Sequence, residues 1–286
     1  MNKWNIVLGP PGTGKTTYLL NTVEKLFDSG IGPHELAYVA FTKKAATEAL
    51  TRAITKFDYA EDSYTYFRTI HSLCYFWQGL TKADILDRKD LRTFSKLVGE
   101  KISSAWDGEN LMALNSKGDK MVFLENMARN TCVDYKLFWQ LANSDISWMH
   151  FDWFVQSYNN FKETNFLLDY TDMLSGFLDM DTSPMLRALI VDEAQDLSAL
   201  QWKCVHKLAR NVENVYIAGD DDQAIYKWAG ADTEHFINLD GKEIYLDQSY
   251  RVPRRVHDVA LNIVSRIKRR REKTWIPKEE EGTVTY

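Results

Sequence analysis

Short runs of consecutive apolar residues alternate along the chain with longer segments of helical periodicity. Residues 6–8 are an apolar run that ends at a Gly-Pro-Pro-Gly turn, and residues 17–27 then repeat apolar side chains at helical spacing. Residues 36–41 predict a second buried strand, and the alanine-rich residues 43–57 predict the helix that follows it. The chain is therefore expected to begin with two strand–helix units.

The same alternation returns in the second half of the chain. Residues 186–191 are apolar and end at a pair of acids, a helical pattern then runs through Trp202 and Leu208, and residues 212–218 are the next apolar run. Strands that alternate with helices in this way predict the α/β class, a parallel sheet with helices on both faces.

A different pattern separates these two parts. Residues 77–165 lack strand patterns and carry scattered aromatic and aliphatic residues between charged ones, which predicts an all-helical insertion with a core of its own. The α/β domain would then consist of residues 1–76 together with 166–246. Residues 247–286 are interpreted as the start of a further domain.

Local composition gives finer expectations. Clusters of Gly, Asn, Asp, Ser and Lys predict loops at residues 107–110 and 115–119 inside the insertion. The basic run at residues 268–271 is expected to be the solvated face of a helix. Residues 282–286 have the pattern of a new strand.

The overall composition is that of a globular protein, with 45% hydrophobic and 26% charged residues. The net charge is −5, so any contact with nucleic acid has to come from local patches. Three widely and irregularly spaced cysteines exclude a full disulfide framework and a close-set zinc motif. Without a secretory leader or a membrane-spanning apolar run, we expect a cytoplasmic protein that has no membrane partner.

The turn after the first predicted strand has the pattern of a phosphate-binding loop. Its residues are Gly9, Pro10, Pro11, Gly12, Thr13, Gly14, Lys15, Thr16 and Thr17. In such a loop backbone N–H groups and a helix N-terminus face the phosphates, Lys15 neutralises the β and γ oxygens, and the Thr16 hydroxyl ligates Mg²⁺. The alternative is an ordinary Gly/Pro turn, but the preceding strand and following helix favour binding of a Mg²⁺-complexed nucleoside triphosphate.

Two acids follow the predicted strand at residues 186–191. Asp192 and Glu193 would lie at the carboxyl edge of the sheet, where ligands of parallel sheets bind. Asp192 is a candidate Mg²⁺ ligand, and Glu193 is a candidate for orienting or deprotonating an attacking water. The alternative is that both acids favour a helix N-terminus electrostatically.

Four short blocks of sequence follow one another along the chain. They are the phosphate loop, residues 192–196 (Asp-Glu-Ala-Gln-Asp), residues 219–231 (Gly-Asp-Asp-Asp-Gln-Ala-Ile-Tyr-Lys-Trp-Ala-Gly-Ala) and residues 248–251 (Gln-Ser-Tyr-Arg). Outside the insertion the chain resembles the N-terminal part of superfamily 1 DNA helicases of the UvrD/Rep type. Two weaker blocks, residues 40–46 and 68–73, agree. The resemblance implies a RecA-like fold, ATP and Mg²⁺ as cofactors, and a role in DNA repair or replication.

The resemblance also implies roles for single residues. Gln223 would sense the γ-phosphate, and Tyr226 and Trp228 would stack on bases of single-stranded DNA, a contact that tolerates any sequence. Further contacts with DNA bases or backbone are implied for Phe41, Thr42, Lys43 and His71. For Trp228 and His71, a place in the core is the alternative.

The block at residues 248–251 would complete the nucleotide site. Tyr250 would pack on the nucleotide base, and Arg251 would reach the γ-phosphate from the facing domain. The alternative for Arg251 is that it caps the start of a helix. The catalytic residues implied are Lys15, Glu193, Gln223 and Arg251.

The chain departs from the family pattern at several points. It has no glutamine ahead of the phosphate loop to read adenine, which leaves the preference for ATP over other triphosphates open, and Ala229 stands where the family often has arginine. The motifs that complete a second motor domain are expected beyond Tyr286. We therefore interpret the chain as the N-terminal piece of a longer helicase that is monomeric and alone a weak ATPase.

The implied activity is 3′-to-5′ movement on single-stranded DNA or at single/double-strand junctions, coupled to ATP hydrolysis. One alternative is a nucleotide-gated module that binds single-stranded DNA without unwinding. A phosphate-loop kinase is disfavoured, because residues 223–231 would then have no role.

Overall fold

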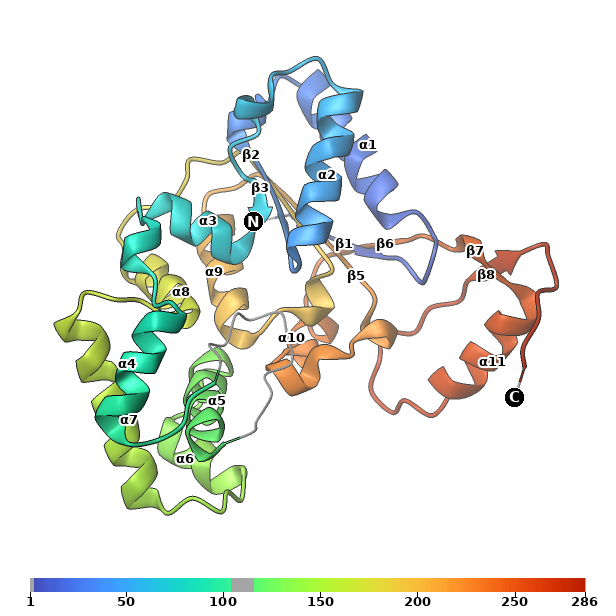
Figure 1. The fold of residues 1–286 in the computed structure, drawn as a ribbon. Coiled ribbons are helices and arrows are strands. Elements are labelled where there is room, and N and C mark those ends of the chain that lie inside the picture. The colour runs from blue at the N-terminus through green and yellow to red at the C-terminus, as the bar shows by residue number, and fades with distance from the viewer. Residues whose placement is uncertain (1–2, 104–115, 286) are drawn as a thin grey trace.

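The computed structural model describes residues 3–103 and 116–285. Its centre is a six-stranded sheet with the strand order β3-β2-β4-β5-β1-β6, and each neighbouring pair is parallel. The strands are β1 (Lys3–Leu8), β2 (Leu36–Ala40), β3 (Phe67–Thr69), β4 (Ala188–Asp192), β5 (Asn214–Gly219) and β6 (Lys242–Tyr245). The α/β class predicted from the sequence is confirmed (Figure 1).

Helices bury both faces of this sheet. In β1, Val7 packs towards α1 (Lys15–Asp28) and α2 (Lys43–Lys56), whereas Ile6 and Leu8 pack on the opposite face. The helices on that second face are α3 (Ile70–Trp77), α8 (Tyr170–Asp179) and α9 (Ala199–Ala209). Because alternate residues of a strand point to opposite faces, burial of both faces explains why the strands are continuous apolar runs.

The first two helices begin where the sequence chemistry indicates. Helix α1 begins at Lys15, directly after Gly14. Helix α2 begins after Thr42, whose Oγ1 accepts a hydrogen bond from the Ala45 N–H at 3.2 Å. Such an N-cap satisfies one of the donors that the first turn of a helix leaves unpaired.

The insertion is helical over its described residues and has its own apolar core. Its helices are α4 (Arg88–Val98), α5 (Lys117–Asn130), α6 (Tyr135–Leu141) and α7 (Trp148–Thr164). Phe94, Phe151 and Phe154 lie at the centre of that core and are fully buried. In the described part of residues 77–165 we find no strand, only an isolated bridge between Ile85 and Leu168.

One predicted loop of the insertion is wrong. Helix α5 begins at Lys117, and Ser116 caps it by accepting a hydrogen bond from the Asp119 N–H at 3.0 Å. Polar and glycine-rich composition favours a loop, but serine is also a frequent N-cap, and here it begins a helix. The predicted loop at residues 107–110 and the start of this one at Asn115 lie outside the described residues.

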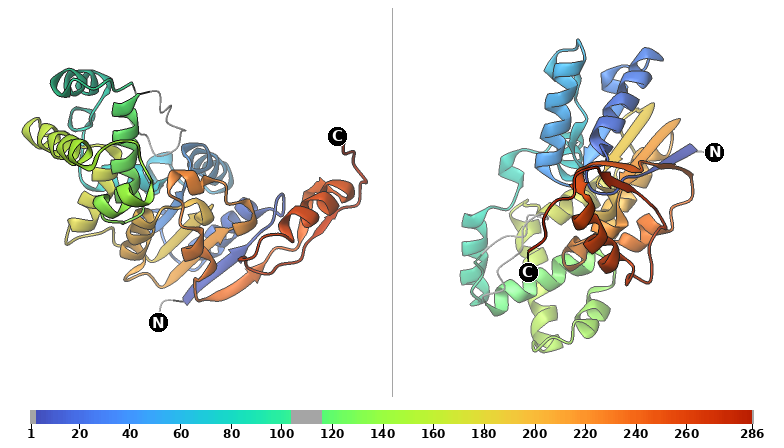
Figure 2. Two further views of the ribbon diagram at one scale, coloured as in Figure 1. Left: turned by 90° about the horizontal axis from the view of Figure 1, so that it is seen from below. Right: turned by 90° about the vertical axis from the view of Figure 1, so that its right-hand side faces the viewer.

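The C-terminal segment, residues 247–285, lies at the opposite end of the molecule from the insertion (Figures 1 and 2). Strand β7 (Gln248–Pro253) pairs in parallel with β8 (Ile276–Lys278). Helix α11 (Arg254–Val264) and the loop after it connect the two strands. The strand predicted at residues 282–286 is wrong over residues 282–285, which have no regular structure, and Tyr286 lies outside the described residues. A single apolar-polar alternation is a weak signal for a strand without a partner.

Short elements complete the described fold. Helix α10 (Thr233–Ile237) precedes β6, and the 3₁₀ turns are Pro33–Glu35, Glu61–Ser63, Lys82–Asp84, Ala194–Asp196, Asp221–Gln223 and Tyr226–Ala229. Among the helices described, none combines the length and the apolar character needed to cross a bilayer.

Candidate active site

The predicted phosphate loop connects β1 to α1 at the carboxyl edge of the sheet. The Gly9 N–H donates a hydrogen bond to Gly219 O at 3.2 Å, which attaches the loop to the end of β5. Gly12 and Gly14 have φ values of +74° and +81°, in the left-handed region that favours glycine. A Cβ atom on Gly12 would also lie 2.3 Å from Cβ of Arg251. Backbone conformation and space therefore both require glycine at position 12.

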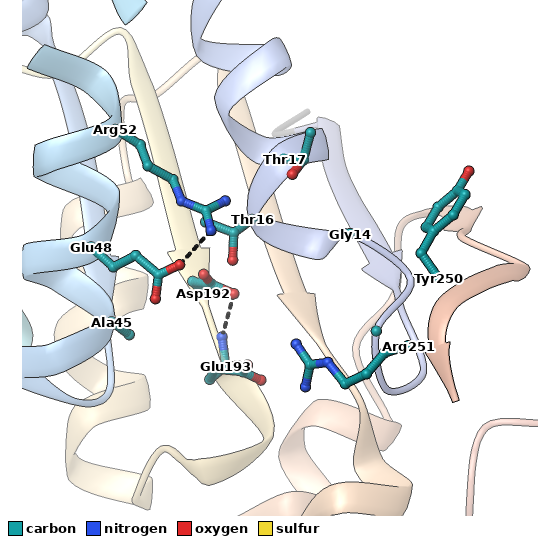
Figure 3. A pocket seen from close by; sticks show the side chains of 11 residues that line it. Gly14, Thr16, Thr17, Ala45, Glu48, Arg52, Asp192, Glu193, Tyr250 and Arg251 are labelled. Atoms are coloured by element: carbon teal, nitrogen blue, oxygen red, sulfur yellow. Dashed lines mark hydrogen bonds and ion pairs between the residues drawn. The ribbon is translucent and has the colours of Figure 1, made fainter. Parts of the chain in front are cut away.

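The loop borders a cavity of about 580 Å³ (Figure 3). The residues lining it are Gly12, Gly14, Thr16, Thr17, Ala45, Glu48, Arg52, Asp192, Glu193, Tyr250 and Arg251. Lys15 is outside this set, because its Nζ donates a hydrogen bond to Gly9 O at 2.9 Å and lies 3.7 Å from Glu193 Oε2. A phosphate group would therefore compete with a loop carbonyl for this ammonium group.

Asp192 ends β4 and is almost completely buried at the cavity. Its Oδ2 accepts a hydrogen bond from the Tyr38 hydroxyl at 2.8 Å, and its Oδ1 accepts one from the Glu193 N–H at 2.9 Å. Burial, and secondarily the adjacent Glu193 carboxylate, raise the pKa of Asp192 to about 6. The carboxylate is thus held in a fixed orientation, and it forms no ion pair within the part of the chain that the structure describes.

Glu193 has a left-handed backbone with φ of +51°, which is uncommon for a residue with a side chain. Such conformations are concentrated at functional sites, where the surrounding structure holds them. The explanation by helix capping is not supported, because the Glu193 side chain caps no N–H of the following 3₁₀ turn and α9 begins only at Ala199. The Glu193 side chain is 39% exposed at the cavity, so water can reach it.

Gln195 and Asp196, which follow Glu193 closely in the chain, are connected to the site although they do not line the cavity. Gln195 Nε2 donates to Glu193 Oε2 at 3.1 Å, and Gln195 Oε1 accepts from the Asp220 N–H at 3.0 Å. Burial raises the pKa of Asp196 to about 7, and the Glu193 carboxylate adds to this rise. Gln195 therefore connects the ends of β4 and β5, a function that the sequence motif alone did not reveal.

Gln223 does not line the cavity in this structure. Its Nε2 donates a hydrogen bond to Asp220 Oδ2 at 2.6 Å, and it ends the 3₁₀ turn Asp221–Gln223 that follows β5. Its place next to the end of β5 brings it to the same sheet edge as Asp192. Its contact with the γ-phosphate stays a prediction.

Strand β7 contacts the phosphate loop directly. The Tyr250 N–H donates to Gly12 O at 2.9 Å, and the buried Ser249 hydroxyl donates to Pro11 O at 2.7 Å. The Arg251 guanidinium points into the cavity, whereas the Tyr250 ring, 75% exposed, points away from it (Figure 3). Arg251 does not cap α11, since that helix begins at Arg254 with no side-chain cap.

Two of the predicted DNA-contacting aromatic residues, Tyr226 and Trp228, form a row on the 219–231 block, and Phe41 packs against Tyr226. The Tyr226 ring lies 5.1 Å from Phe41 and 6.0 Å from Trp228, measured between ring centroids. Phe41 is buried beneath Tyr226, whereas Trp228 is 37% exposed. The core alternative for Trp228 is therefore disfavoured, and Phe41 supports the row from below.

The other predicted DNA contacts differ in exposure. Lys43 is exposed at the start of α2, next to Thr42, which caps that helix. His71 is half-buried, with its ring 6.2 Å from that of Tyr170, and so is neither a core histidine nor fully open. Their contact with DNA stays a prediction.

Sequence reasoning missed three residues of the cavity region. Glu48 and Arg52 lie one turn apart on α2, form an ion pair of 2.6 Å, and line the cavity opposite the phosphate loop. Tyr38 is the one aromatic residue in the strand Leu36–Ala40, which is the only signal that pointed to a polar contact there. Spacing of four residues on a helix that follows a strand could have indicated the Glu48–Arg52 pair.

A phosphate loop and paired acids at the carboxyl edge of a parallel sheet define a RecA-like nucleotide-binding fold. Residues 1–243 match the UvrD/REP helicase N-terminal domain family, and the chain belongs to that family. The resemblance noted in the sequence is therefore confirmed.

Individual relatives extend the similarity over nearly the whole chain. A probable DNA helicase of Mycoplasma pneumoniae is 28% identical over 300 residues, which cover 96% of this chain and 55% of that protein. The ATP-dependent DNA helicase PcrA of Bacillus subtilis is 25% identical, over 98% of this chain and 40% of that protein. The chain thus spans about half the length of such relatives or less.

Proposed function

We propose that this chain is the ATP-binding and hydrolysing part of a superfamily 1 DNA helicase that moves on single-stranded DNA. One observation carries the proposal: the phosphate loop, the acids that end β4 and Arg251 of β7 surround a single cavity. Relatives named as ATP-dependent DNA helicases, such as PcrA, support the choice of ATP and DNA. We take 3′-to-5′ movement from the family resemblance.

Within this cavity each residue has a distinct proposed role. Lys15 and Arg251 would stabilise the charge that develops on the γ-phosphate, from opposite sides. Glu193 would accept a proton from the attacking water, and Gln223 would report whether a γ-phosphate is present. Tyr250, exposed at the rim, would pack on the nucleotide base.

The residues present fit a bound Mg²⁺. Thr16 and Asp192 both line the cavity, and the raised pKa of the buried Asp192 is that of a carboxylate lacking a cation. Among the described residues no group of three or more His, Cys, Asp or Glu side chains is arranged to hold a metal ion by itself, but Mg²⁺ usually keeps waters and phosphate oxygens as ligands and needs few from protein. Bound Mg²⁺ would neutralise charge on the β and γ phosphates.

The row of Tyr226 and Trp228 would stack on DNA bases, with Lys43, Thr42 and His71 as further contacts. Stacking on an aromatic ring contributes roughly 1–3 kcal/mol per base and does not depend on base identity. The 219–231 block carries both this row and Gln223. Nucleotide state and DNA binding would therefore be linked through one short segment.

We propose domain boundaries at residues 1–76 with 166–246, 77–165 and 247–286, as the sequence indicates. The chain alone is expected to be a monomeric, weak ATPase that does not separate DNA strands. The alternative, a nucleotide-gated single-stranded-DNA module, is favoured by one observation: Gln223 is not among the residues that line the cavity.

Steady-state ATP hydrolysis with and without oligo-dT tests the proposal. Wild type should be stimulated by DNA, Glu193→Gln should lose turnover, and Trp228→Ala should lose stimulation only. Trp153→Ala is the matched control, because Trp153 is 48% exposed on α7 and outside the aromatic row. Nucleotide and DNA binding without any DNA-stimulated turnover would contradict the enzyme and support the alternative.

A further inference from the structure

A buried lysine of the C-terminal segment contacts three consecutive carboxylates at the end of β5. Lys273 Nζ lies 2.9 Å from Asp220 Oδ1, 2.6 Å from Asp221 Oδ1 and 3.0 Å from Asp222 Oδ2. Its side chain is 1% exposed. Burial alone would lower the Lys273 pKa, but the carboxylates, Asp220 foremost, raise it above its usual value. Charges so far from water persist only when they are paired and hydrogen-bonded.

Two arginines beside Lys273 attach the same segment to the α/β domain. Arg270 donates two hydrogen bonds to the Asp222 carboxylate, at 2.7 Å and 2.6 Å. The Arg271 N–H donates to Asp221 Oδ2 at 2.7 Å, and the buried Arg271 guanidinium contacts Glu243. The expectation of a solvated helix face at residues 268–271 is therefore wrong for the helix, because α11 ends at Val264, and for Arg270 and Arg271, which pair with acids of other elements. Lys268 and Arg269 are exposed, as expected.

Asp220 connects this lysine to the proposed active site. It is fully buried, and its Oδ2 accepts the hydrogen bond from Gln223 while its Oδ1 contacts Lys273. Its N–H donates to Gln195 Oε1, and Gln195 Nε2 donates to Glu193 Oε2. A continuous path of hydrogen bonds thus leads from Lys273 to both Gln223 and Glu193.

We infer that Lys273 is a positioning residue for the proposed nucleotide site, which holds Asp220 and through it orients Gln223 and Glu193. The inference rests on the proposed function. Its consequence is that recognition of the γ-phosphate depends on the segment 270–273 being seated against the end of β5. The same segment begins with β7, which contacts the phosphate loop, so the C-terminal part of the chain holds both loops at the cavity.

The physical reason lies in the charge of Asp220. Without Lys273, the buried Asp220 carboxylate would lose the cation that it contacts, while Arg270 stays paired with Asp222, and Asp220 would take up a proton or draw in water. Either change alters the acceptor of the Gln223 amide. The contacts of Lys273 are with residues 220–222 and with Arg271 O, not with Lys15 or Thr16 of the phosphate loop, so binding of the α and β phosphates should be preserved.

The test compares affinities for AMP-PNP and ADP, each with Mg²⁺, by titration calorimetry. Lys273→Gln should weaken AMP-PNP binding by about tenfold and leave ADP binding within about twofold. Lys273→Arg should restore most of the AMP-PNP affinity, because the cation returns. Arg270→Gln is the matched control: it removes an anchor of the same segment but contacts only Asp222, so the ratio of the two affinities should stay at the wild-type value.

A double-mutant cycle decides whether Lys273 acts through Gln223. Adding Lys273→Gln to Gln223→Ala should change the ratio of the two affinities no further, whereas additive effects would overturn the inference. If the Lys273→Gln variant does not fold, the double variant Lys273→Gln, Asp221→Asn is used instead, because it removes one buried acid together with the lysine. Wild type that binds neither nucleotide would overturn the proposed function together with this inference. Binding by wild type with an unchanged ratio in Lys273→Gln would overturn the inference alone.

Discussion

Two groups of buried carboxylates in this molecule have opposite electrostatic surroundings. At the base of the insertion, Asp169 and Asp172 each contact both Arg129 and Lys162, at distances from 2.5 to 2.8 Å. Those cations hold the pKa of Asp169 far below its usual range, even though burial alone would raise it. At the cavity, burial raises the pKa of Asp192 to about 6, with no comparable cation in contact.

The difference separates a group that stabilises the fold from one that is suited to a ligand. Paired acids hold the insertion to the α/β domain, because Arg129 lies on α5 and Asp169 and Asp172 flank the start of α8. An unpaired buried carboxylate destabilises the folded protein when no ligand is bound, and a bound cation removes that destabilisation. Electrostatic pairing, rather than burial alone, therefore distinguishes the site.

The largest expected effect is on stability at the paired cluster. Arg129→Met should lower the free energy of unfolding by about 3–5 kcal/mol, because the buried Glu125 loses its ion-pair partner and Asp169 and Asp172 lose one of their two cations. Asp192→Asn should change it by less than about 1 kcal/mol, since it removes an acid that has no cation. Urea unfolding at pH 7 without Mg²⁺ measures both, and equal losses in the two variants would contradict the comparison.

The next effect is on the rate of ATP hydrolysis, where the Asp192 variant should lose more than a variant of the paired cluster. Asp192→Asn should reduce Mg²⁺-dependent ATP hydrolysis by about 100-fold, because the amide is a poor ligand for a hard cation. A variant of the paired cluster that still folds, such as Lys162→Arg, should keep turnover within about threefold. Full activity of Asp192→Asn at saturating Mg²⁺ would rule out a role of this carboxylate in binding the metal.

A smaller effect concerns pH. The raised pKa values of Asp192 and Asp196, about 6 and about 7, mean that the folded chain keeps protons which the unfolded chain has released above about pH 4. The free energy of unfolding should therefore fall as the pH rises from about 5 to 8, in the absence of Mg²⁺ and nucleotide. Asp196→Asn should reduce this total fall between pH 5 and 8 by on the order of 2 kcal/mol, and urea titrations at four pH values would show it.

Asp169 should act in the opposite direction and in another range. Its pKa is depressed, so its contribution to stability is present at neutral pH and is lost only well below pH 4.

For the Asp196→Asn prediction, an identical pH slope between 5 and 8 in wild type and variant would show that the cavity acids are already paired.

The smallest expected effect is that of Tyr38. Its hydroxyl donates to Asp192, and this bond lowers the Asp192 pKa against the effect of burial. Tyr38→Phe should cost about 1 kcal/mol of stability. It should also move the acid limb of the pH–rate profile for ATP hydrolysis towards higher pH, because a larger fraction of Asp192 would be protonated. A profile that does not move would show that the hydroxyl only fills space.

The sequence predicted the elements that depend on local pattern. The strands and helices around the phosphate loop are continuous apolar runs and periodic segments, and the insertion lacks strand patterns, so each could be placed to within a few residues. The motif order placed Lys15, Asp192, Glu193 and Arg251 correctly in one region. Their common feature is that short segments carry the information.

The contacts that could not be predicted join residues far apart in the chain. Tyr38 meets Asp192 across 154 positions, and Lys273 meets Asp221 across 52. No periodicity or motif links such pairs, because they depend on how whole elements pack. The basic run at residues 268–271 was interpreted by composition alone, which gives no information about the acids that it meets.

The contact between β7 and the phosphate loop also sets an order of events during synthesis. The Ser249 hydroxyl bonds to Pro11 across 238 positions, so one side of the nucleotide cavity leaves the ribosome long after the other. At about 5–20 residues per second, the phosphate loop waits on the order of ten seconds or more for its partner strand. During that interval the nascent α/β domain has its glycine-rich loop but not Arg251, and the wall of the cavity is complete only once β7 has emerged.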